Sequence, residues 1–445
     1  MFVKIIRKSH IKELLAQHSM KNIKKRGIVI SYILLFFYVP SSAQGTVKDS
    51  ICEPTDSVKP PAYYPSEKHS FIHQISAEIR PGAVFQTNDF LRGYTEPGKE
   101  HRYFYSLHFK YAIQFKPHTL VDRIFEGTYQ GIGFNYYNFG DKRQLGNPMS
   151  VYLFQGARIA QLNPRLSFNY EWNLGLSWGW KHYDYDTNPN NVVIGSKLNA
   201  YINAAFYLKW RVSREFDLIT GVDLTHFSNG NTEIPNAGLN LINFKYGIIY
   251  NFNREEDKPK QTYTPLVIPD FKSHITYDFL LFGSWRRKGV MFGDKKIASP
   301  CKYNVWGFNF APMYNLCYRF RTGISIDGVC DTSSGATAED GIAALGEDSK
   351  PQFRHSSIAN QLALGVSGRA EYVMPYFAIN LGIGVNVLHG GSDLKSVYEV
   401  LALKTEVTKN LYLHVGYTLQ NFHSPNFLMF GIGFRFNNSA TKIYR

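Results

Sequence analysis

The sequence predicts an all-β protein, an antiparallel transmembrane β-barrel, and three observations support this class. From about residue 71, long segments alternate between apolar and polar residues, and clusters of Gly, Pro, Asn and Asp separate them, as in β-strands. The connections alternate between short and long, as in outer-membrane barrels. The 445 residues are 44% hydrophobic and 16% aromatic. After residue 43, however, no apolar run reaches the roughly 18 residues of a membrane-spanning helix, which excludes a helical membrane protein.

The first 43 residues have the three parts of a secretory signal peptide. A cationic stretch at 20–26 precedes a mostly apolar stretch at 28–39, and the small residues at 41–43 offer a cleavage site. Met20 is an alternative start, because residues 1–19 add nothing that a signal needs. Residues 44–70 are polar and Pro-rich, so we expect a periplasmic tether there. The predicted location is the bacterial cell outer membrane.

Eight strands are expected in residues 71–253. Most reach the roughly 9–11 residues that a tilted strand needs to cross a bilayer. In 215–228 the even positions are mainly apolar and the odd ones more polar. In a soluble sandwich the apolar face would point into a core, but the signal peptide and the strand length favour a face that contacts lipid. The eight strands are predicted near 72–86, 104–115, 129–138, 150–162, 166–179, 197–212, 215–228 and 238–252.

An internal repeat predicts a second unit. Residues 208–229 align without gaps on 403–424, at an offset of 195 and with seven identities. A divergent eight-strand unit is therefore expected at 272–437, after a linker at 254–271 and before a polar tail at 438–445. Two arrangements are open: two eight-stranded barrels in tandem, or one sixteen-stranded barrel, which would leave a channel. The length of the linker favours two units.

The net charge of +14 is a weak argument for a nucleic-acid partner. Half of it belongs to the expected signal peptide, because residues 1–43 hold eight Lys or Arg and one acid. The remainder does not point to nucleic acid, and we expect none to bind. Contact with anionic lipid head groups stays compatible with this charge.

A disulfide between Cys301 and Cys330 is a further hypothesis. Both residues fall at the outer ends of adjacent expected strands. Exported proteins fold under conditions that allow disulfides. Neither Cys52 nor Cys317 has an evident partner.

The informative site contains His226 and Ser228. Two residues apart on a strand, they share one face. It is the apolar face, where placing an imidazole or a hydroxyl against lipid costs free energy. We therefore expect these groups to have a function there. Ser beside His is the minimal pair for nucleophilic acyl transfer, and Asn240 opens the next strand on the same face, where it can orient the imidazole. If the chain enters from the periplasm, the seventh strand ends at the outer leaflet, where lipopolysaccharide lies.

These residues resemble the lipid A 3-O-deacylase family (PagL-type, also labelled acyloxyacyl hydrolases). The family consists of eight-stranded outer-membrane barrels with a His-x-Ser-Asn motif followed by Pro-Asn-x-Gly, and the resemblance covers residues 71–253. It implies that Ser228 is the nucleophile and His226 the general base of lipid A 3-O-deacylation, with lipopolysaccharide and outer-membrane lipids as partners and with no metal or cofactor. It also implies a supporting role for Asn229 and an oxyanion-hole role for Asn236. The matching residues are His226, Ser228, Asn229, Pro235, Asn236 and Gly238.

One position departs from the family, since Asn240 stands where the family has a catalytic Glu. An Asn can orient a His but cannot stabilise an imidazolium by charge. Three functions are therefore open: a lipid A deacylase, a non-catalytic lipopolysaccharide-binding or structural barrel, and a sixteen-stranded pore. The second unit carries Asn421 and His423 at the positions of His226 and Ser228, so we expect it to lack catalysis. A homo-oligomer is compatible with the sequence.

Overall fold

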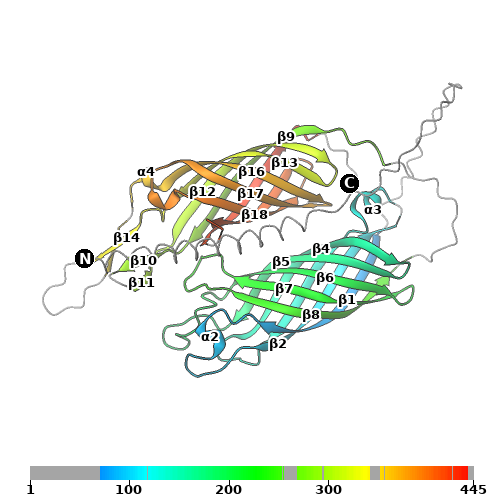
Figure 1. Ribbon diagram of the computed structural model, residues 1–445, viewed down its shortest axis with the longest axis horizontal. Coiled ribbons are helices and arrows are strands. Elements are labelled where there is room, and N and C mark those ends of the chain that lie inside the picture. Colours follow the sequence, from blue (N-terminus) through cyan, green and yellow to red (C-terminus); the bar gives the residue numbers. More distant parts are fainter. Residues whose placement is uncertain are drawn as a thin grey trace, which may run out of the picture. The chain divides into compact units, whose positions relative to one another are not determined.

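The described part of the chain forms two closed, eight-stranded antiparallel barrels (Figure 1). The computed structural model describes residues 71–438, except 118, 253, 255–267, 293–294, 341–350, 355 and 423. Strand β8 (Leu239–Phe252) pairs with β1 (Phe71–Val84), and β20 (Ser424–Phe436) pairs with β9 (His274–Arg286). Each half therefore closes on itself, and the alternatives of one sixteen-stranded barrel and a sixteen-stranded pore are wrong. The expected signal peptide and tether, and most of the expected linker and tail, lie outside the described residues.

The first barrel follows the eight expected segments to within a few residues. The expected connection at 116–128 contains helix α3 (Leu120–Phe125), where the side chain of Thr119 caps the helix by accepting a hydrogen bond from the N–H of Asp122. Helix α2 (Asp89–Arg92) lies between β1 and β2. The remaining strands are β2 (Tyr103–Phe115), β3 (Tyr129–Asn138), β4 (Gly146–Asn163), β5 (Leu166–Trp180), β6 (Asn199–Arg211) and β7 (Phe216–Ser228).

The second barrel repeats this topology and adds two hairpins outside the barrel wall. The hairpins are β10 (Gly289–Phe292) with β11 (Lys295–Ala298), and β14 (Thr337–Asp340) with β15 (Pro351–Arg354). Two short helical elements, α4 (Ile358–Gln361) and η1 (Ser392–Leu394), lie in the connections. The other strands of the wall are β12 (Tyr303–Cys317), β13 (Phe320–Asp331), β16 (Leu362–Met374), β17 (Phe377–His389), β18 (Val397–Glu406) and β19 (Leu411–Gln420).

Each barrel has a short-turn end and a long-loop end. In the first barrel, β4 and β5 are joined by the two residues 164–165, whereas β5 and β6 are joined by 181–198 at the other end. In the second barrel, residues 318–319 form a short turn, and 332–361 form a long connection that contains β14, β15 and α4. The alternation predicted from the sequence is therefore present in both barrels.

The outer faces carry the apolar side chains that the alternation predicted. Large apolar and aromatic residues along the strands are exposed, while the residues between them point into the barrel. Such an outward apolar band suits the hydrocarbon region of a bilayer. No helix among the described residues is long and apolar enough to cross a membrane. Outward side chains of this kind include Ile75, Ile79, Phe109, Leu218, Phe244, Leu281, Trp306, Ile324 and Ile432.

Side chains fill the middle and the long-loop end of the first barrel, whereas a cavity of about 270 Å³ lies near its short-turn end. Halfway along the barrel, Lys110 and Lys245 both pair with Glu171, with Nζ–Oε distances of 2.8 and 3.0 Å, and Arg80 Nη1 lies 3.2 Å from Asp223 Oδ2. Buried charges are tolerated when they are paired in this way. Towards the long-loop end, the interior is closed by a cluster of buried aromatic rings. This aromatic cluster comprises Tyr137, Phe139, Trp180, Tyr201 and Phe227.

Candidate active site

The hairpin of β7 and β8 carries the predicted site. The strand register pairs His226 with Asn240 and Ser228 with Ala200. On β7, Leu224 is 55% exposed, whereas Phe227 is fully buried in the lumen. His226 and Ser228 have the same parity as Leu224 and are half-buried. The structure therefore places both on the outer face, where β7 ends at the long-loop rim.

Asn240 determines which nitrogen of His226 carries the proton. His226 Nδ1 lies 2.7 Å from Asn240 Oδ1. An amide oxygen only accepts hydrogen bonds, so Nδ1–H donates and Nε2 keeps its lone pair. Within the described residues, no hydrogen bond joins Ser228 to His226. The imidazole thus has a basic nitrogen available on the face that it shares with Ser228.

Two asparagines organise the loop that follows Ser228. The side chain of Asn229 donates to the carbonyl of Glu233 at 3.1 Å and accepts from the N–H of Glu233 at 3.4 Å. The N–H of Asn229 donates to Asn236 Oδ1 at 3.1 Å, and Asn236 Nδ2 lies 3.4 Å from Asn231 Oδ1. Asn236 therefore anchors the backbone directly after Ser228, with its oxygen used inside the loop. Its predicted oxyanion-hole role, which would use Nδ2, stays a prediction.

Gly238 is required both by its backbone and by the imidazole beside it. Its φ of +75° lies in the left-handed region, and a Cβ added there would be 2.8 Å from His226 Cε1. The N–H of Gly238 donates to the carbonyl of Val193 at 3.1 Å. A Cβ on Gly195 would lie 2.1 Å from the carbonyl oxygen of Pro235. The Pro-Asn-x-Gly segment is thus packed against the 192–195 backbone and holds His226 from one side.

The expected disulfide is absent, because Cys301 and Cys330 are both free thiols. The physical reason is the strand register. Cys330 on β13 faces Trp306 on β12, five residues beyond Cys301. Cys301 precedes β12 and is exposed, whereas Cys330 is buried. Adjacent strands are therefore not sufficient to bring these two cysteines together.

The corresponding hairpin of the second barrel has a different loop. β19 and β20 are joined by residues 421–423, whereas β7 and β8 are joined by 229–238. Asn421, at the position of His226 in the alignment, lies exposed in this turn, and His423 lies outside the described residues. Across the part of the chain that the structure describes, no group of three or more His, Cys, Asp or Glu side chains could hold a metal ion.

Two family models match the chain, one in each barrel. Residues 105–248 match the model described as lipid A 3-O-deacylase (PagL). Over these residues, the first barrel matches the PagL family. The PagL match includes His226, Ser228 and Asn240 and extends from β2 into β8. Residues 275–438 match the model described as the C-terminal domain of acyloxyacyl hydrolase, which covers the second barrel.

Solved barrel structures are similar to this chain at low sequence identity. Neisserial surface protein A is 9% identical to this chain. The match covers 41% of this chain and 97% of the neisserial protein, with a TM-score of 0.26. The outer membrane enzyme PagL is 16% identical to this chain. The match covers 39% of this chain and 97% of PagL, with a TM-score of 0.24. The siderophore receptor PirA from Acinetobacter baumannii is 9% identical to this chain. The match covers 79% of this chain and 68% of the receptor, with a TM-score of 0.20. None of the curated proteins matches.

Proposed function

We propose that the first barrel is an outer-membrane serine ester hydrolase that removes the 3-O-linked 3-hydroxyacyl chain from lipid A. The observation that carries the proposal is the placement of Ser228 and His226. They share the outward face of β7 at the long-loop rim, and Asn240 orients the imidazole with a hydrogen bond of 2.7 Å. The PagL match over residues 105–248 supports lipid A as the substrate.

In this mechanism, Nε2 of His226 is the general base. It takes the proton of Ser228 as Oγ attacks the ester carbonyl, and the imidazolium then gives that proton to the 3-oxygen of the sugar as the ester bond breaks. The products of this step are 3-O-deacylated lipid A and an acyl-enzyme. His226 next deprotonates a water molecule, which attacks the acyl-enzyme and releases the 3-hydroxy fatty acid.

The outward position suits a substrate that lies in the membrane. Lipid A contributes its acyl chains to the outer leaflet, so an ester near the head group lies at the depth of the barrel rim. A site inside the barrel would be blocked by the aromatic cluster, which includes Phe227 directly between His226 and Ser228 in sequence. Export by the predicted signal peptide would bring the chain to this membrane.

Asn240 supplies orientation without charge in this proposal. With a Glu at this position, a carboxylate would stabilise the imidazolium formed in the acylation step. Asn240 Oδ1 instead accepts the Nδ1 proton as a neutral dipole. Cys-His-Asn hydrolases use the same arrangement. We therefore expect turnover, at a rate that a charged partner would raise.

The test is mass spectrometry of purified lipid A incubated with detergent-folded protein. Wild type should remove the mass of one 3-hydroxyacyl group, and Ser228→Ala should remove none, because it lacks the nucleophile. Thr220→Ala is the matched control: it also removes a hydroxyl from the exposed face of β7, but far from the rim. It should behave like wild type.

Equal hydrolysis by Ser228→Ala and wild type would refute the assignment of the nucleophile. No mass loss with folded wild-type protein, over several lipid A species, would instead favour a non-catalytic lipopolysaccharide-binding barrel.

A further inference from the structure

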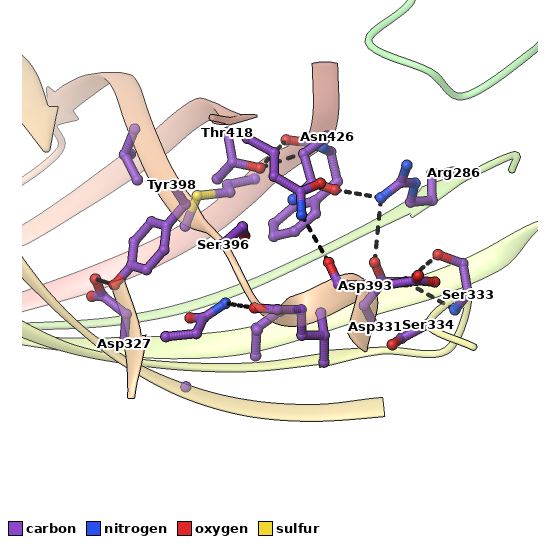
Figure 2. Close-up of a pocket in the computed structure, with 18 of the residues that line it drawn as sticks. Arg286, Asp327, Asp331, Ser333, Ser334, Asp393, Ser396, Tyr398, Thr418 and Asn426 are labelled. Carbon is purple, nitrogen blue, oxygen red and sulfur yellow. Dashed lines mark hydrogen bonds and ion pairs between the residues drawn. The ribbon is translucent and has the colours of Figure 1, made fainter. Parts of the chain in front are cut away.

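The second barrel contains a cavity where the first is filled. An eight-stranded barrel is just wide enough for its own side chains to fill it. In the first barrel, the rings of Tyr201 and Phe227 are fully buried at the long-loop end, with centroids 5.4 Å apart. In the second barrel, the lumen at this end holds a cavity of about 440 Å³ (Figure 2). Small-molecule sites are commonly about 300–1,000 Å³.

Two sequence changes account for the missing rings. The offset of 195 relates β6 and β7 to β18 and β19, and the register agrees: Lys209 faces Ile219, and their counterparts Lys404 and His414 also face each other. The counterpart of Tyr201 is Ser396, which lines the cavity. The counterpart of Phe227 is Phe422, which is 49% exposed and therefore does not fill the lumen.

Most of the charges that line the cavity are paired, but the lining holds four cations and three carboxylates. Arg286 Nη1 lies 3.3 Å from Asp331 Oδ2, and Lys288 Nζ lies 2.5 Å from Asp393 Oδ2. Deeper in the lumen, Arg369 Nη2 lies 2.8 Å from Asp327 Oδ2. Arg286, Lys288 and Arg369 are each neutralised by a carboxylate, and the exposed Lys395 leaves the lining with a small net positive charge. It offers charged donors and acceptors to a ligand that is itself uncharged.

Two polar atoms of residues in the lining lack hydrogen-bond partners among the described residues, and both are shielded from the cavity by neighbouring atoms. Ser334 is 1% exposed and lines the cavity, and its Oγ has no hydrogen-bond partner among the described residues. The Nε of Arg286, in the same lining, is also buried without a partner in the described part of the chain. Buried polar atoms are rarely left unpaired in native proteins. Figure 2 shows Ser334 beside Asp331 and opposite Asn426 across the cavity.

One wall of the cavity is apolar and partly aromatic. The rings of Phe282 and Phe427 are stacked, with centroids 6.3 Å apart and an interplanar angle of 12°, and Met429 lies in the same lining. Tyr398 adds a ring whose hydroxyl donates to Asp327 Oδ2 at 2.7 Å. Aromatic rings and hydroxyls, carboxylates and a guanidinium in one lining suit a sugar ring, which has C–H faces and a rim of hydroxyls.

We propose that the second barrel binds an uncharged saccharide of one or two rings in this lumen cavity. Sugar hydroxyls would donate to Asp331, and rotation of the Ser334 and Arg286 side chains would let their unpaired atoms hydrogen-bond to the sugar, while the ring lies against Phe427. The saccharide is either a unit of an envelope glycan or a free sugar, since both present the same chemistry. This proposal does not depend on catalysis by the first barrel.

The test is saturation-transfer-difference NMR and titration calorimetry on the full chain, folded in a detergent without a sugar head group. The probes are the methyl glycosides of glucose, galactose and mannose, lactose, and a neutral O-chain oligosaccharide of lipopolysaccharide. Inorganic phosphate serves as the anionic probe. We expect saturable binding of at least one saccharide and none of phosphate.

Ser396→Tyr restores the ring that the first barrel has at this position, so it should weaken saccharide binding at least tenfold. Lys409→Tyr is the matched control, because Lys409 is exposed in the turn at the opposite end of the same barrel. Ser334→Ala, which removes a hydroxyl without filling the cavity, should weaken binding by a smaller factor.

The binding profile distinguishes the two sources of the saccharide. Binding of the neutral O-chain oligosaccharide alone would assign an envelope glycan, and binding of a simple glycoside alone would assign a free sugar. The proposal is overturned if no probe binds, if phosphate binds instead, or if Ser396→Tyr binds as wild type while its melting temperature is unchanged.

Discussion

Replacing Gly238 with Ala should disable the site through the imidazole of His226. The added Cβ would lie 2.8 Å from His226 Cε1, whereas ordinary contacts are 3.4–4 Å. The ring must therefore move by at least about 0.6 Å, and a misplacement of about 1 Å can cost about a hundredfold in rate. The same Ala also places a side chain in the left-handed region, which costs roughly 1–2 kcal/mol of stability.

Gly140→Ala separates these two effects. Gly140 has a φ of +68°, and a Cβ there would meet nothing within 4 Å. Both variants should lose similar stability in thermal unfolding followed by circular dichroism. Only Gly238→Ala should lose lipid A hydrolysis, by about tenfold to a hundredfold in the initial rate. Hydrolysis at the wild-type rate by a folded Gly238→Ala protein would refute the reasoning that this glycine protects the position of His226.

Two further predictions concern the hydrogen bond to His226 and the buried charges. Asn240→Ala should lower the initial rate of lipid A hydrolysis, because the tautomer of His226 is no longer selected, and Asn240→Glu should raise it above wild type, because a carboxylate stabilises the imidazolium. Glu171→Leu removes one of the two carboxylates that Lys110 and Lys245 share; Glu78 remains, but the buried cluster is left with one uncompensated positive charge. The free energy of unfolding in urea should then fall by about 3–5 kcal/mol, and a change below about 1 kcal/mol would contradict this account of the lumen.

The strands and the orientation of the site could be predicted because both depend on local periodicity. The second strand, expected near 104–115, is Tyr103–Phe115. The alternation of side chains along a strand also placed His226 and Ser228 on the outward face, opposite in parity to Phe227. The hydrogen bond from His226 to Asn240 followed from the position of Asn240 at the start of the next strand on the same face.

The role of Asn236 depends on how the loop folds back on itself. The sequence placed Asn236 eight residues after Ser228, as a donor for the site. In the structure, its oxygen accepts the N–H of Asn229. No periodicity describes the 229–238 loop, so the contacts of its side chains depend on the neighbouring backbone at 192–195, more than thirty residues away in the sequence.

By itself, the sequence determined the fold class, the strands of the first barrel and the outward Ser-His pair, because alternation and motif spacing act over a few residues. Only the tertiary structure decided the closure into two barrels, since that depends on pairing between distant strands such as β1 and β8. It also decided that Cys330 faces Trp306 and not Cys301. The alignment matched Phe422 with Phe227, but one ring is exposed and the other buried. Which space a side chain fills depends on register and loop path, which residue identity alone does not encode.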